Sequence, residues 1–174
     1  MPLNKKLLNK VKKHILAEPK RLFMSTWYVK GTPGKTQFMS EQSWGETQIS
    51  FANCGMAGCI AGWTCILGLT DEQKELQQGL DHISISQQAR ALLGITSAYE
   101  RLEPFELFYV NKWPLQQQRE YLALKDTYND NGQAQKRRAE IVAEVIDLFK
   151  KGYDEFEKRQ KAVTKEKEYF RKLT

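Results

Sequence analysis

The feature that most constrains the fold is the last part of the chain, which contains no proline and only one glycine. Between residues 133 and 173 only Gly152 interrupts side chains that tolerate a helix. Apolar residues from Ala139 to Phe149 recur at helical spacing and form a wide face. The pattern therefore predicts a long C-terminal helix whose first part packs against the rest of the protein.

Beyond this face the apolar residues are sparse and charges dominate. Four of them are separated by three or seven positions: Tyr153, Phe156, Val163 and Phe170. Such spacing would allow a partner helix to pack along a narrow seam. We therefore divide the chain into a single helical domain, residues 1–151, and a charged helical extension, residues 152–174. This division predicts that truncation after Lys151 leaves the domain folded.

The remainder of the chain predicts shorter helices. Residues 3–17 place apolar side chains at a spacing of four, and Pro19 ends this helix because the residue before a proline avoids helical geometry. Residues 22–29 are β-prone and predict a short strand. Further helices are expected within 55–67, 70–79, 84–93, 97–110 and 113–124. The predicted fold is mainly α, a compact multi-helix domain with a minor short-strand component and a long C-terminal helix.

The chain has 174 residues and a net charge of +6, and the charge is unevenly distributed. Residues 1–21 contain seven Lys and Arg against one Glu, and residues 150–174 contain nine basic residues against five acidic ones. Residues 22–149 contain eleven basic and fifteen acidic residues. Basic ends can bind nucleic acid or another anionic surface. Solvated helix faces are the simpler interpretation, because no helix-turn-helix or aromatic–basic motif is recognisable.

Two further patterns bear on location. The basic start of the chain leads into no apolar segment of the signal-peptide type, and three cysteines do not suggest a disulfide framework, so we expect a cytoplasmic protein. Residues 47–70 lack charges, but only 59–69 are densely apolar, which is short for a membrane span. We therefore expect no membrane association.

The most unusual segment is rich in cysteine and glycine, from Asn53 to Trp63. We expect a buried helix over 55–67, with Asn53 as its N-cap and Trp63 anchoring the core. Cys54 at a helix N-terminus would have a lowered pKa, and Cys59 could act as its resolving thiol. His14, on the basic side of the first helix, is expected to be solvated.

Other interpretations of these cysteines remain open. Cys54, Cys59, Cys65 and His82 supply enough donor atoms for a metal, but their spacing matches no standard zinc or iron–sulfur pattern. His82 could also serve Cys54 as a base, although papain-like enzymes need a downstream strand series that is not visible here. Free cysteines are often simply small buried apolar residues.

The run Cys54-Gly55-x-x-x-Cys59-Ile60-Ala61-Gly62-Trp63 resembles the signature of a family of small uncharacterised bacterial and phage proteins. Three other parts are similar to that family: 17–19, 91–94 and 107–110. The similarity spans roughly residues 5–150 and excludes the charged tail. Met56 departs from the family pattern, in which Thr is common. Since the family has no established activity, the resemblance implies a shared fold and leaves the function open.

Taken together, these patterns favour a small, non-enzymatic cytoplasmic interaction or regulatory protein without a cofactor. We expect a protein partner, or self-association, through the C-terminal helix. The alternative is a thiol-based redox or metal-binding protein that uses Cys54 and Cys59. A third hypothesis is nucleic-acid binding through the basic termini, which is less favoured.

Overall fold

The computed structural model describes residues 2–22, 28–30, 56–76, 82–102, 105–124 and 132–173. These residues form the helices α1 (Lys5–Ala17), α2 (Ile60–Gly68), α3 (Asp71–Leu76), α4 (His82–Leu93), α5 (Ser97–Leu102), α6 (Leu115–Ala123) and α7 (Gln133–Leu173). The remaining elements are two 3-10 turns, η1 (Pro19–Arg21) and η2 (Val110–Lys112), and two strands, β1 (Tyr28–Lys30) and β2 (Met56–Gly58). The predicted mainly α fold with a minor strand component and a long C-terminal helix is confirmed.

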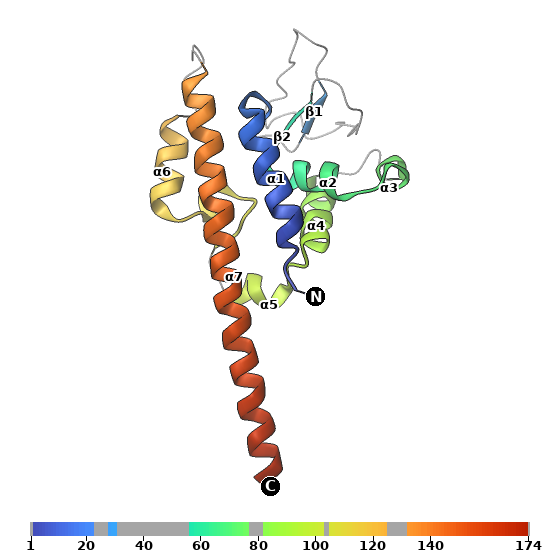
Figure 1. Cartoon of the computed structure of the whole chain (residues 1–174), viewed down its shortest axis with the longest axis vertical. Helices are drawn as coiled ribbons and strands as arrows, with labels where there is room; N and C mark the ends of the chain where they lie inside the picture. Colours follow the sequence, from blue (N-terminus) through green and yellow to red (C-terminus); the bar gives the residue numbers. More distant parts are fainter. Residues whose placement is uncertain are drawn as a thin grey trace.

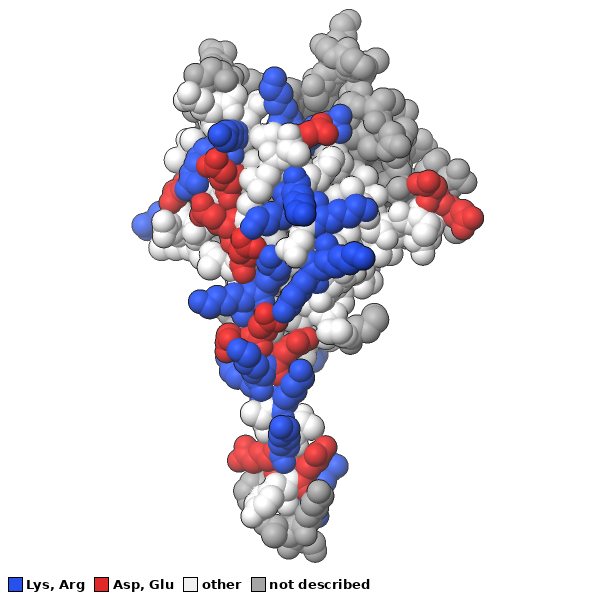
Figure 2. Space-filling view, viewed as in Figure 1, with Lys and Arg blue, Asp and Glu red and all other residues white. Residues whose placement is uncertain are grey.

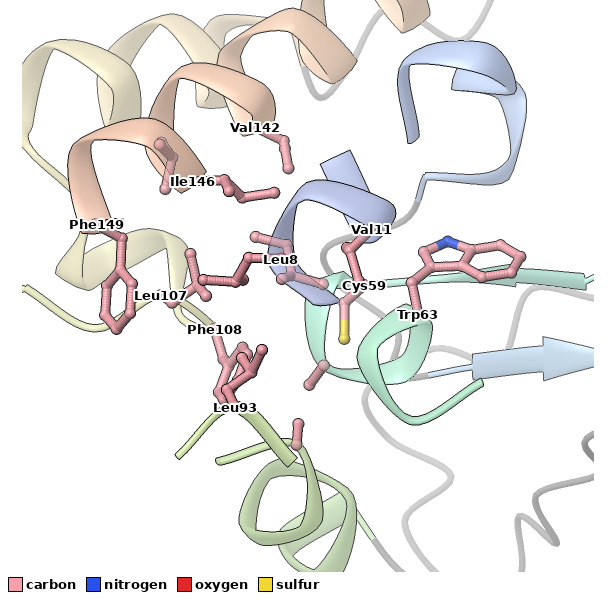
Figure 3. Packing of buried hydrophobic residues seen from close by; sticks show 14 of the residues in the cluster. Leu8, Val11, Cys59, Trp63, Leu93, Leu107, Phe108, Val142, Ile146 and Phe149 are labelled. Atoms are coloured by element: carbon pink, nitrogen blue, oxygen red, sulfur yellow. The ribbon is translucent and has the colours of Figure 1, made fainter. Parts of the chain in front are cut away.

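Helix α1 lies at the centre of the core, between α7 on one side and α2 on the other (Figure 1). Its apolar stripe is buried as the spacing predicts: Leu7, Leu8, Val11 and Ile15. Figure 3 shows Leu8 and Val11 in the middle of this core. Val142 and Ile146 of α7 lie on one side of them, and α2 lies on the other. Packing against two helices makes α1 the element that joins the two halves of the domain.

The start of α1 is fixed to the end of α4 by Asn4. Its Oδ1 accepts a hydrogen bond from the Leu7 amide at 3.0 Å, which caps α1. Its backbone N–H and its Nδ2 donate to the carbonyl oxygens of Leu93, at 2.7 Å, and Leu92, at 3.2 Å. Gly94 then ends α4 in the left-handed region, with φ at 70°, as a helix-terminating glycine does. Asn4 therefore satisfies groups at the ends of two helices.

Helix α7 runs the length of the molecule, and its C-terminal part projects beyond the other elements (Figure 1). The packed part extends past the predicted boundary at Lys151, because Tyr153 and Phe156 are only 1% and 5% exposed. The Tyr153 hydroxyl donates to the Gly94 carbonyl at 3.0 Å and accepts from the Thr96 amide at 3.3 Å. This burial moves the end of the packed part to Phe156 and argues against a domain that ends at residue 151.

An ion-pair cluster centred on Arg90 connects α4 to α5 and to the segment that follows α5. The Arg90 guanidinium forms ion pairs with Glu100 and, at 3.5 Å, with Glu106. It also lies over the rings of Phe108 and Tyr109, at 5.6 and 5.9 Å from their centroids. One partly buried cation therefore joins three parts of the chain through charge and aromatic contacts.

Candidate functional site

The cysteine- and glycine-rich segment begins as a strand and continues as a helix. Residues 56–58 pair antiparallel with 28–30, with Ala57 opposite Val29. Helix α2 starts only at Ile60, so the prediction of a helix from Gly55 is wrong. Pairing with a strand far away in the sequence holds these residues in an extended conformation. Local periodicity in the sequence does not reveal such a distant partner.

Cys59, and not Asn53, is the N-cap of α2. Its Sγ accepts a hydrogen bond from the Gly62 amide at 3.5 Å, in the manner of a capping side chain. The sequence predicts Cys54 at the N-terminus of this helix, but the helix begins later, at Ile60. Asn53 and Cys54 themselves lie outside the described residues.

Both described cysteines are buried and protonated at neutral pH. Cys59 and Cys65 are each 2% exposed. Burial, which disfavours the thiolate, raises the pKa of Cys59 to about 11 despite the opposing Gly62 amide, and the pKa of Cys65 to about 12. The Cys65 thiol donates to the Ile85 carbonyl at 3.6 Å. In this arrangement both sulfurs serve packing and hydrogen bonding, and a reactive-thiol hypothesis depends on Cys54.

Of the four candidate metal donors, only Cys59 and Cys65 have side chains that the structure describes. His82 is the first residue of α4, and its side chain, like Cys54, lies outside the description. Among the described residues no group of three or more His, Cys, Asp or Glu side chains is placed to hold a metal ion. The hypotheses of a metal site and of a Cys54–His82 pair remain predictions.

Trp63, a residue of α2, anchors the core, as predicted. Its side chain is 2% exposed, and its Nε1 donates to the Arg21 carbonyl at 3.2 Å. The His14 ring packs on it with centroids 4.1 Å apart and planes at 51°. Trp63 therefore connects α2 both to α1 and to the turn after α1.

The expectation that His14 is solvated is only partly right, because its side chain is half-buried. Its Nε2 is buried and has no hydrogen-bond partner among the described residues. Desolvation is the largest influence and lowers the pKa of the imidazole; Glu18 opposes this and Arg21 reinforces it. The sequence signal for the burial of Nε2 was the position of His14, which comes directly before Ile15 and borders the apolar stripe of α1.

Two exposed features remain as candidate interaction surfaces. The first is α7 beyond Phe156, where the described side chains from 158 onward are exposed. The second is a group of Lys and Arg side chains over α1 and the adjoining part of α7, visible near the middle of Figure 2. No described helix combines the length and apolar character that crossing a membrane requires.

Comparison with known proteins gives no match, whether to a family model, to a curated protein or to a solved structure. The resemblance proposed from the sequence thus stays a prediction, and function has to be argued from these surfaces.

Proposed function

We propose that this is a non-enzymatic interaction protein that self-associates through the projecting part of α7. The observation that carries the proposal is that this helix continues far past its last buried residue, Phe156, into a region of exposed side chains. Within that region Val163 is 44% and Tyr169 is 62% exposed. Covering these side chains would remove apolar surface from water and so stabilise the projecting helix.

The spacing of the apolar residues supports a helical partner. Phe149, Phe156 and Val163 follow one another at intervals of seven, and the first two are buried in the domain. The stripe that packs in the core therefore continues onto the projecting helix. A seven-residue interval keeps apolar residues along one side of a helix, as in coiled coils. A second copy of the chain would present the same stripe.

Helix energetics favour an additional contact. An isolated helix shorter than about 12–15 residues is marginal in water, and longer ones gain most of their stability from packing. Local ion pairs such as Lys158–Glu155, at 2.8 Å, are exposed to solvent and contribute little to stability. Self-association would add the burial of apolar surface that these pairs do not provide.

A cytoplasmic location is part of the same proposal. It is supported by Cys65, whose thiol forms no disulfide in the described structure. Free thiols are typical of a reducing compartment.

The test is the oligomeric state of the full chain, measured by light scattering over a range of concentrations. We expect a dimer, and a variant with Val163→Glu and Phe170→Glu, two positions of the seven-residue series, should raise its dissociation constant at least about tenfold, which is about 1.4 kcal/mol. The matched control is Leu102→Glu with Leu115→Glu, because these two side chains are 63% and 58% exposed on α5 and α6. A monomeric wild-type chain, or equal weakening by the control, would contradict the proposal.

A further inference from the structure

The basic side chains of α1 and η1, together with Lys150 and Lys151 on α7, form one surface that we call the basic face (Figure 2). It contains nine Lys and Arg and three acidic residues, Glu18, Asp147 and Asp154. Its excess of six positive charges equals the net charge of the whole chain. The charges outside the basic face sum to zero, because residues 155–174 carry an excess of three positive charges and the remaining residues an excess of three negative charges.

Ion pairs hold the α1–α7 border of the basic face in place. Lys5 pairs with Asp154 at 2.6 Å, while Lys12 and Lys150 share Asp147. Lys150 also donates to the Asn9 Oδ1 at 2.7 Å. These contacts align the two helices and neutralise only part of the positive charge of the basic face.

Other lysines of the basic face point to solvent. Lys6, Lys13 and Lys20 are exposed, and no ion pair of theirs is found within the described ranges. Lys10 donates to the Leu67 carbonyl at 3.0 Å and keeps its charge at the surface. Along a helix Lys6 and Lys13 are separated by a rise of about 10 Å. The exposed ammonium groups thus form a row, with Lys20 continuing it past the end of the helix.

We propose that the basic face binds the phosphate backbone of double-stranded nucleic acid without reading its sequence. Lysine is a compact point charge that suits phosphate contacts and lacks the planar fork of arginine, which reads bases or binds in a bidentate manner. A row of such charges complements a duplex, which carries about one negative charge per 1.7 Å of its axis. The proposal does not rest on self-association through α7.

The composition of α1 distinguishes this ligand from other polyanions. Single-stranded nucleic acid is usually bound with aromatic stacking, and α1 contains no Phe, Tyr or Trp. A membrane-bound amphipathic helix inserts its apolar face, whereas the apolar stripe of α1 is buried in the core and Leu16, at 40%, is its one exposed large apolar side chain. Contacts of charge alone with a rigid row of phosphates remain the best fit.

The experiment measures binding of the full chain to a short mixed-sequence DNA duplex by fluorescence anisotropy, between about 50 and 200 mM salt. Five phosphate contacts, from Lys6, Lys10, Lys13, Lys20 and Lys151, predict a slope of about −4.5 for log Kobs against log salt. The test variant combines Lys6→Gln, Lys13→Gln and Lys20→Gln and should reduce the slope by about 2.7.

A matched control removes three exposed charges away from the basic face: Lys136→Gln, Lys161→Gln and Lys165→Gln. This variant should keep the slope within about one unit of the wild type. Thermal melts establish that both variants are folded before binding is compared. Three results would overturn the proposal: no duplex binding at about 50 mM salt, equal loss in both variants, or lysine-dependent binding to phosphatidylserine vesicles without binding to the duplex.

Discussion

Shortening α7 at two different points separates its packed part from its projecting part. We compare a chain that ends at Lys151 with one that ends at Gln160. The shorter chain lacks the buried Tyr153 and Phe156, and the longer one retains both. Loss of a buried Phe side chain costs about 3–5 kcal/mol, and loss of Tyr153 also removes a hydroxyl that makes two hydrogen bonds.

The size of the effect follows from these contacts. The two rings lie 6.0 Å apart and both pack on Tyr99, so their contributions are coupled and do not simply add. Taking the lower end of the range, about 3 kcal/mol, for each ring gives a loss of about 6 kcal/mol before coupling, which is comparable with the whole stability of a domain, about 5–15 kcal/mol. The chain ending at Lys151 is therefore expected to be largely unfolded at 25 °C. The chain ending at Gln160 should lie within about 1 kcal/mol of the full chain.

Urea denaturation followed by circular dichroism measures both free energies of unfolding. Two substitutions in the full chain serve as a control pair: Phe156→Ala should cost about 3–5 kcal/mol, and the exposed Val163→Ala less than about 1 kcal/mol. If the chain ending at Lys151 melts like the full chain, Tyr153 and Phe156 do not belong to the core. If the chain ending at Gln160 is unfolded, the projecting helix contributes more to stability than its exposure indicates.

Three further predictions concern the surroundings of α2. Trp63→Ala should lower the free energy of unfolding in urea by about 3–5 kcal/mol, and a loss below about 1 kcal/mol would contradict its place in the core. The pKa of His14 is lowered in the native state, so the unfolded chain binds more protons and the free energy of unfolding should fall as the pH decreases through about 6.5. His14→Phe should flatten this pH dependence in denaturation curves measured between about pH 7 and 5. Cys54→Ser leaves Cys59 and Cys65 as the remaining cysteines, and at about pH 8 roughly 0.1% or less of each is thiolate. A disulfide reagent should therefore label these two cysteines only after denaturation. Fast labelling of the native protein would show that they are accessible.

The elements that the sequence predicts well are those set by local pattern. Helix α1 was expected over 3–17 and is found at Lys5–Ala17, because its apolar stripe and the following Pro19 are both local signals. Gly94 ends α4 for the same reason, since a left-handed residue at that point favours glycine. Such features depend on neighbours a few residues away and can be inferred from one sequence.

The features that the sequence did not reveal depend on distant partners. The strand at 56–58 exists because 28–30 pairs with it, and this pairing displaces the start of α2 from Gly55 to Ile60. The burial of Tyr153 requires Gly94 and Thr96, which lie 59 and 57 residues away. A sparse apolar pattern is compatible with both a solvated and a packed helix, so only the tertiary contacts decide between them.

The meeting of the first and last helices at the end of α4 has a consequence for synthesis of the protein. Asn4 and Tyr153 bind neighbouring carbonyls there, and Lys5 and Asp154 are 149 residues apart. At about 5–20 residues per second, the ribosome needs roughly 7–30 seconds to make the chain between them. During that interval the apolar stripe of α1 lacks its partner on α7, so the nascent chain exposes a surface to which chaperones can bind. The domain therefore completes its core only after nearly all of the chain has been translated.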